Sequence, residues 1–289
     1  MNHPNLHILK RQSSRPRFKT LGEKMKKTII AAIVVLVIVI AAVGIYFTVL
    51  DKDDKDKNEI TFLIEDDQGV YFWIKGTGET GKDAFIDAAE KSGIDYDYTD
   101  SSFGMFISEI NGLAGGVSYN PYWALYVYEN GEWISSEQGI SSIVSADHDY
   151  LGWFFVYADD QYNVTLPEVI PNVKDAKVWN KDSTSGTVFT IASPTEMYFR
   201  INGSSNESLM DAFSKACSEY KVPLVKSDDG EISTIFGFGK DAGKDWNKYS
   251  VENNAWKITT EDMSDLSSAD HSKFLVFYSE EGVTPIMPI

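Results

Sequence analysis

Residues 122–135 read YWALYVYENGEWIS, and this stretch decides the fold. Asn130-Gly131 is the strongest short signal for a β-hairpin, because a tight two-residue turn needs positive φ angles that Asn and Gly adopt readily. The turn joins predicted strands over Tyr122–Glu129 and Glu132–Ser135. We therefore expect an antiparallel hairpin built largely from aromatic and aliphatic residues.

The two faces of this hairpin are both apolar. Side chains alternate between the faces of a strand. One face therefore carries Trp123, Leu125 and Val127, and the other carries Tyr122, Ala124, Tyr126 and Tyr128. One face can pack on a helix, whereas the other must meet a second sheet surface, a neighbouring copy of the domain or a ligand.

The sequence around the hairpin predicts the rest of an α+β domain. Thr80 caps a helix, with Asp83 three residues further on, and Gly93 ends it. Further strands are expected at residues 60–64, 70–75, 105–110 and 151–157. The order β-β-α-β-β-β-β favours one helix covering one face of a mixed sheet, a layout compatible with a β-grasp.

The sequence predicts that this domain occurs twice. YFWIKG at residues 71–76 corresponds to YFRING at 198–203. Five hairpin positions keep a constant register: Trp123, Tyr126, Glu129, Asn130 and Trp133 match Trp246, Tyr249, Glu252, Asn253 and Trp256. The unit is too long for a solenoid repeat, so each copy is expected to be a complete domain. We predict a first copy at 59–158, a Pro-containing linker at 159–187 and a divergent second copy at 188–289.

A membrane segment is predicted before the first copy. Residues 28–50 read TIIAAIVVLVIVIAAVGIYFTVL, with no charged side chain, and about 20 apolar residues can span a bilayer. Residues 1–27 are basic and residues 51–58 form a charged stem, so the positive-inside rule puts the N-terminus in the cytoplasm and both domains outside. A cleaved signal peptide is the competing interpretation, although the apolar run is long for one. Met25 also resembles a start, which would make residues 1–24 an upstream extension.

Charge and cysteine content narrow the class of protein. The chain holds 26 basic and 43 acidic residues, and residues 51–289 alone carry a net charge of −24. So acidic a surface repels nucleic acid and anionic headgroups. Cys217 is the one cysteine, so the chain cannot form an intramolecular disulfide and is not a disulfide-stapled scaffold.

The sequence shows no catalytic pattern. It has no Gly-rich phosphate loop, no nucleophile elbow and no His or Cys pair with metal-ligand spacing. Cys217 lies on the apolar face of the second predicted helix, which favours a small core residue over a nucleophile. His148 lies between Asp147 and Asp149, and acidic turns of this kind more often cap backbone groups than bind a metal. We expect no enzyme, no metal and no cofactor.

Residues 70–157 resemble the transcobalamin-like C-terminal domain family. The resemblance rests on INGL at 110–113, Tyr122-Trp123, Asn130-Gly131, Gly139-Ile140 and the acidic turn 147–149 before Trp153. His148 departs from the usual glycine of that turn, and the second copy fits more weakly. The resemblance implies a β-grasp fold, a surface protein and a corrinoid ligand. Animal cobalamin carriers complete the site with a helical barrel, so here a corrinoid would need half of that site, both copies or a partner.

The candidate ligand-binding residues are Tyr119, Tyr122, Trp123, Tyr126 and Trp133. Tyr and Trp offer rigid contact area with a polar tip, which suits binding. A core role is favoured for Trp123, whereas Tyr122, Tyr126 and Trp133 fit either a buried sheet or a ligand site. The Gly-rich loop 112–120 has no full counterpart in the second copy, so binding is expected in the first.

Two functions follow from these features. The first is a membrane-anchored extracytoplasmic protein that binds a small soluble ligand, with a corrinoid such as cobalamin as a candidate. The alternative is a non-catalytic structural or adhesive envelope protein that uses the domains as a stalk and a protein-binding surface. In both, the chain is a single-pass protein of the cell membrane.

Overall fold

The computed structural model describes residues 58–289, except residues 103, 117–119, 162, 184–185 and 205. These residues fall within one compact unit, residues 56–289. The predicted cytoplasmic segment, the predicted membrane helix at 28–50 and all but the last residue of the stem lie outside the described residues. Within the described part, no helix is both long enough and apolar enough to cross a membrane.

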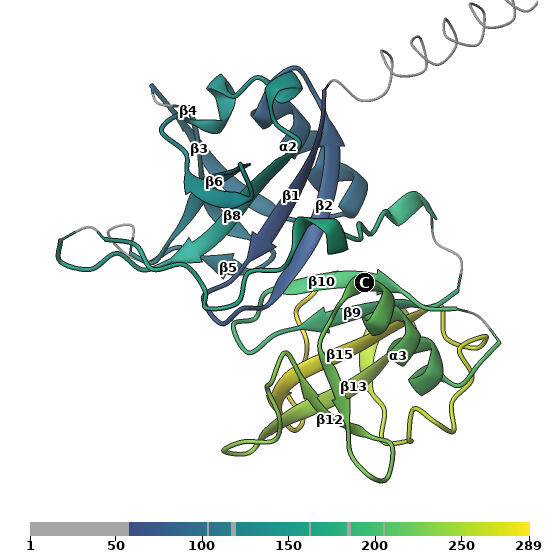
Figure 1. Ribbon diagram of the computed structural model, residues 1–289. Coiled ribbons are helices and arrows are strands. Elements are labelled where there is room, and N and C mark those ends of the chain that lie inside the picture. Colours follow the sequence, from purple (N-terminus) through teal and green to yellow (C-terminus); the bar gives the residue numbers. More distant parts are fainter. Residues whose placement is uncertain (1–57, 103, 117–119, 162, 184–185, 205) are drawn as a thin grey trace, which may run out of the picture. The chain divides into compact units, whose positions relative to one another are not determined.

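The described residues form an α+β fold, as predicted, with two α-helices and mostly sheets (Figure 1). The first half contains β1 (Glu59–Glu65), β2 (Tyr71–Thr77), α2 (Gly81–Ser92), β3 (Tyr96–Ser101), β4 (Gly104–Ile110), β5 (Leu113–Ala114), β6 (Tyr122–Glu129), β7 (Glu132–Ser135) and β8 (Tyr150–Val156). The second half contains β9 (Val188–Ala192), β10 (Tyr198–Asn202), α3 (Leu209–Tyr220), β11 (Leu224–Lys226), β12 (Ile232–Ile235), β13 (Lys244–Glu252), β14 (Ala255–Ile258) and β15 (Lys273–Glu280).

Each half has a five-stranded mixed sheet, and the two sheets share one strand order. The orders are β2-β1-β8-β6-β7 and β10-β9-β15-β13-β14. β1 runs parallel to β8, and β9 runs parallel to β15, whereas the other neighbours are antiparallel. Because the registers correspond, a position in one half can be matched to its equivalent in the other.

Local sequence signals place the hairpin and the first helix. The β6–β7 hairpin begins and ends at the predicted residues, and Asn130 and Gly131 both have positive φ. Thr80 and Asp83 form the capping box of α2, and Gly93 ends the helix in the left-handed conformation. The sequence prediction missed the exposed strand β3, which pairs with β4 at one edge of a separate three-stranded sheet in the order β3-β4-β5.

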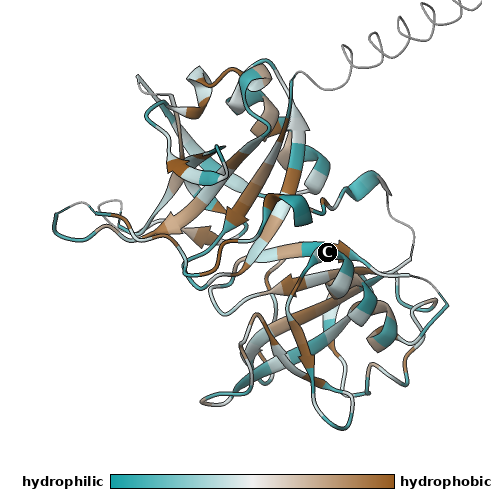
Figure 2. Ribbon diagram, viewed as in Figure 1, coloured by the Kyte–Doolittle hydropathy of each residue, from teal (hydrophilic) through white to brown (hydrophobic). Residues whose placement is uncertain are grey.

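The helix-facing sides of both sheets build one continuous core. α2 and α3 each lie against their own sheet (Figure 1), and Figure 2 shows strongly hydrophobic residues along the strands. Phe62 of β1 meets Phe85 of α2 edge to face, with ring centroids 5.5 Å apart. Phe189 and Phe213 form the corresponding contact in the second half, at 5.1 Å. Each helix is thus held by burial of its apolar face.

The opposite face of the first sheet is covered by the segment that connects the halves. Leu63, Trp73, Tyr126 and Phe154 share one buried cluster on that face. Six apolar side chains of residues 164–178, which we call the strap, pack into the same cluster: Val164, Leu166, Ile170, Val173, Ala176 and Val178. This corrects the expectation that a second sheet, a neighbouring domain or a ligand would cover the aromatic face. Part of the predicted linker at 159–187 belongs to the core of the first half.

The C-terminal tail covers the second sheet in the same way. Met287 is buried in a cluster with Tyr249 and Phe277. The indole N–H of Trp256 donates to the carbonyl oxygen of Met287 at 3.0 Å, and the Tyr249 hydroxyl donates to that of Val283 at 2.7 Å. Each sheet is therefore closed by the stretch that follows its last strand.

Candidate functional site

The structure places the predicted binding residues in different surroundings. Tyr119 lies outside the described residues. Trp123 is only 2% exposed, and its indole N–H donates to the carbonyl oxygen of Leu113 at 3.0 Å. Its ring packs on Phe155, with centroids 5.1 Å apart. The core role favoured for Trp123 is therefore confirmed.

The other candidate aromatics lie on the face under the strap. Tyr126 is buried, and its ring meets Phe154 edge to face at 5.1 Å. Trp133 is half-buried and meets the same Phe154 ring at 5.4 Å. Tyr122 is also half-buried and packs against this cluster. The described candidates thus do not form one exposed patch, and their assignment to a ligand stays a prediction.

A cleft of about 370 Å³ opens beside two of the predicted residues. Its walls include Phe106 of β4, Tyr122 and Trp123 of β6, and Trp153 of β8, together with the turn at 135–140; we call it the β4–β6 cleft. Glu137 is the only charged side chain among the described residues that line it. The cleft falls in the size range of small-ligand sites, about 300–1,000 Å³.

Trp153, one of the residues that line this cleft, carries an unusual polar group. Its side chain is 3% exposed, and its indole N–H has no hydrogen-bond partner among the described residues. A buried donor without an acceptor is uncommon and costs free energy. Trp153 pairs with Ile64 across the sheet, and in the second half Val276 pairs with Ile191 in the equivalent register. The second half therefore has an apolar side chain where the first has this donor.

A second cleft, of about 420 Å³, shares part of the 135–138 turn with the first. Glu129, Asp147 and His148 line it. The His148 Nδ1 atom lies 3.6 Å from a carboxylate oxygen of Glu129. Across the part of the chain that the structure describes, no three His, Cys, Asp or Glu side chains are grouped so as to hold a metal ion.

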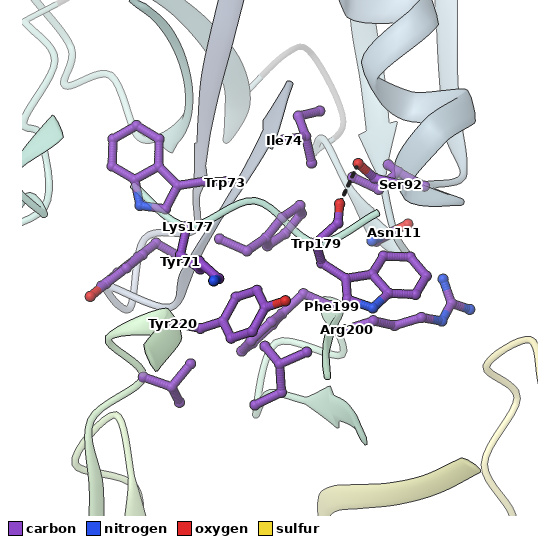
Figure 3. A pocket seen from close by; sticks show the side chains of 14 residues that line it. Tyr71, Trp73, Ile74, Ser92, Asn111, Lys177, Trp179, Phe199, Arg200 and Tyr220 are labelled. Atoms are coloured by element: carbon purple, nitrogen blue, oxygen red, sulfur yellow. Dashed lines mark hydrogen bonds between the residues drawn. The ribbon is translucent and has the colours of Figure 1, made fainter. Parts of the chain in front are cut away.

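A much smaller cavity lies where side chains of the two halves meet (Figure 3). Its volume of about 20 Å³ leaves room for about one water molecule. Arg200 closes one side: its guanidinium donates to the carbonyl oxygen of Gly93 at 2.8 Å and lies over the Trp179 ring at 5.7 Å. Phe72 and Phe199 stack nearby, with centroids 5.7 Å apart. We call the region around this cavity, where side chains of the two halves meet, the seam. The cavity in the seam is too small to hold a ligand larger than water.

Several contacts across the seam start from equivalent positions of the two halves. Tyr71 begins β2, and its hydroxyl donates to the carbonyl oxygen of Lys221, just after α3, at 2.7 Å. Tyr198 begins β10, and its hydroxyl donates to a carboxylate oxygen of Asp95, just after α2, at 2.7 Å. The stacked phenylalanines are the next residue in each strand. The seam is therefore two-fold in its tyrosines and phenylalanines but not in its acceptors, which are a backbone carbonyl in one half and a side-chain carboxylate in the other.

Glu65 and Asp66 carry two buried carboxyl groups at the β1–β2 turn. Asp66 accepts hydrogen bonds from the backbone N–H groups of Gln68 and Val70 and from the Thr195 hydroxyl. Burial outweighs these donors and raises the pKa of Asp66 to about 6. Thr195 lies 129 residues further along the chain than Asp66, so this hydrogen bond depends on the tertiary structure.

Cys217 takes the place expected for a core residue. It is 1% exposed, within the helix-facing core of the second half. Burial raises the pKa of its thiol, so the reactive thiolate is strongly disfavoured.

No protein-family model matches the chain, and no curated protein matches it either. The likeness of residues 70–157 to transcobalamin-like domains therefore rests on the residues quoted above and stays a prediction.

Proposed function

We propose that the chain is a non-catalytic binding protein for a small soluble, uncharged ligand, and that the β4–β6 cleft in the first half is its site. In this proposal residues 28–50 anchor the chain in the cell membrane and the two halves face the outside. Each half is proposed to be a β-grasp-like domain of the transcobalamin-like type. The observation that carries the proposal is the cleft of ligand size, whose lining includes Trp153, a buried side chain with no hydrogen-bond partner for its indole N–H among the described residues.

The chemistry of the cleft sets what it can take. An indole N–H can only donate, so it calls for an acceptor such as a carbonyl, amide or hydroxyl oxygen. Tyr122 and Phe106 add aromatic area along the walls, which suits a flat or apolar group. With one carboxylate and no basic side chain among the described lining residues, an anionic ligand would remain uncompensated.

A corrinoid is the candidate ligand that the family resemblance suggests. It is larger than the ligands that a cleft of about 370 Å³ can enclose. The cleft can therefore contact only one edge of a corrinoid, and the rest of the surface would have to come from a partner or from a second molecule. Cobalamin is thus a first probe of the site rather than its established ligand.

The test is a titration of the full-length protein, in detergent micelles, with cobalamin and then with a panel of neutral amides and sugars. A shift of the corrinoid absorbance band reports the binding of cobalamin, and calorimetry reports the binding of the amides and sugars. Trp153→Phe removes the N–H and keeps an aromatic ring, so a ligand that uses it should bind about 5-fold to 20-fold more weakly. Tyr122→Ala tests the aromatic wall, and Tyr119→Ala tests the sequence-based prediction that this residue takes part in binding. Binding that these variants leave unchanged would move the site elsewhere.

A matched control comes from the second half. Val276 is the equivalent of Trp153, and Val276→Ile changes an equivalent buried position without touching the cleft. It should leave affinity unchanged. If every probe fails to bind the wild-type protein, the small-ligand proposal is lost.

The seam supports the alternative function, a structural or adhesive envelope protein. Its contacts join the halves through side chains as well as through the connecting segment, as a stalk requires. Chemical crosslinking on intact cells should then capture an envelope partner. A protein that stays monomeric and uncrosslinked at its native level would count against this alternative.

A further inference from the structure

Glu65, the last residue of β1, is buried without a partner. Its side chain is 0% exposed, and neither carboxylate oxygen has a hydrogen bond within the described residues. Alternation along the strand places it on the face of Leu63, the face that the strap covers. A buried carboxyl group with no partner is costly in its charged form and less so in its protonated form.

The second half shows that the fold does not require this group. Glu65 pairs with Tyr71 and Phe154 on its two sides, and Ala192 pairs with Tyr198 and Phe277 in the same register. Ala192 is fully buried as well, in the cluster that the C-terminal tail closes. An alanine therefore fills the same place in a sheet of the same order.

The Asp66 carboxylate, next in the chain, opposes the charge of Glu65. Tyr71 faces Glu65 from β2, and both Glu65 and Asp175 of the strap raise the pKa of Tyr71. The strap also carries Lys174 and Lys177, and neither contributes to the pKa shift of Glu65. Burial, with a smaller effect of Asp66, raises the pKa of Glu65 to about 9.

We propose that Glu65 is a pH-sensitive latch: the strap stays closed over the first sheet while Glu65 holds its proton, and opens when that proton is lost. The latch lies on the outer face of the sheet and does not depend on the β4–β6 cleft binding a ligand. Opening would expose the aromatic face that carries Trp73, Tyr126 and Phe154.

The direction of the pH effect follows from the two states. In the open state Glu65 returns to its ordinary pKa of 4.5, whereas in the closed state the pKa is about 9. Closure is therefore strongest below pH 4.5, weakens as pH rises through the interval, and levels off above pH 9. Within the interval the closure constant falls about tenfold for each pH unit, because opening releases one proton.

Hydrogen exchange of the full-length protein in detergent micelles tests this. Exchange is compared at about pH 6.5 and about pH 8.5, as protection factors corrected for the intrinsic rate. The Asp66 carboxyl, with a pKa of about 6, is mostly ionised under both conditions. Peptides spanning residues 173–178 should lose roughly 100-fold in protection between the two conditions. A strap protection that stays constant in the wild-type protein would overturn the proposal.

Three variants isolate the group responsible. Glu65→Ala copies the second half, and Glu65→Gln keeps the shape without the charge; both should abolish the pH dependence of strap protection. Glu59→Gln is the matched control, because Glu59 lies on the same strand and face but is partly exposed and paired with Lys75 at 2.6 Å. It should keep the wild-type dependence. The same loss of protection in Glu65→Gln as in wild type would also overturn the proposal, even if Glu65→Ala did not fold.

Discussion

Replacing the stacked phenylalanines should show how strongly the seam couples the two halves. The Phe72 and Phe199 rings are 5.7 Å apart and inclined by 11°. Both side chains are buried, at 8% and 3% exposure. Removal of such a side chain by Phe→Ala costs about 3–5 kcal/mol, against a typical domain stability of about 5–15 kcal/mol. Either alanine variant should therefore lower the free energy of unfolding by a large fraction of the total.

A double-mutant cycle separates the contact from simple burial. Phe72→Leu and Phe199→Leu keep an apolar side chain at each position but lose the stacked rings. Aromatic pairs contribute about 0.5–1.5 kcal/mol beyond the area they bury, so the double variant should recover a coupling energy of about that size. Phe62→Leu with Phe189→Leu is the control pair, because each of these rings packs against the helix of its own half. Their effects should add within about 0.5 kcal/mol.

The assay is urea unfolding of the full-length protein in detergent, followed by tryptophan fluorescence. The wild-type protein should unfold in one transition, because the core is continuous across the halves. In the Phe72→Ala and Phe199→Ala variants, this single unfolding transition should separate into two. Additive effects for Phe72 and Phe199, with a single transition in every variant, would refute the reasoning.

Three further predictions concern single side chains. Cys217 should resist thiol reagents in the native protein and react in urea, because it is buried and its pKa is raised; rapid native labelling would contradict this packing. Lys221→Gly should stabilise the protein by about 1 kcal/mol and Gly93→Ala should destabilise it similarly, because both positions hold left-handed φ angles at helix ends; urea midpoints measure both. Thr195→Val should raise the pKa of Asp66 further, since it removes a hydrogen-bond donor to the carboxylate; an NMR titration that gives an unchanged pKa would argue against that bond.

The sequence predicts those parts of the fold that are determined by residues close together in the chain. The positive φ of Asn130 and Gly131, the capping box at Thr80 and Asp83, and the alternation along β6 each depend on residues close in the chain. The strap could not be predicted in this way. Its apolar residues follow neither a helix nor a strand period, and Pro167 and Pro171 interrupt the stretch. Where they pack is decided by the sheet surface they meet.

The β4–β6 cleft, like the strap, could not be predicted from local sequence signals. β3 consists of mostly exposed polar residues, so no periodicity indicated it. Because β3, β4 and β5 form a sheet of their own, β4 stands apart from the main sheet and leaves space beside β6. Trp153 is part of the apolar run LGWFFV, which predicts burial but cannot show that its N–H lacks an acceptor.

The two halves also act as a comparison within one molecule. Three of the aromatic hairpin residues that first suggested a ligand site are shared by both halves: Trp123, Tyr126 and Trp133 correspond to Trp246, Tyr249 and Trp256, whereas Asp245 stands in place of Tyr122. Trp123 and Trp246 are both buried, and each donates its indole N–H to a backbone carbonyl. The halves also differ in two buried polar side chains. Within the part of the chain that the structure describes, the Glu65 carboxylate and the Trp153 indole N–H have no hydrogen-bond partner, and Ala192 and Val276 take their places in the second half. Because the second half forms the same sheet with Ala192 and Val276, the fold does not need Glu65 and Trp153 at these positions. Burying each of these polar groups without a partner costs free energy. The first half is therefore distinguished by these two groups and by Tyr122, rather than by the aromatic residues that both hairpins share.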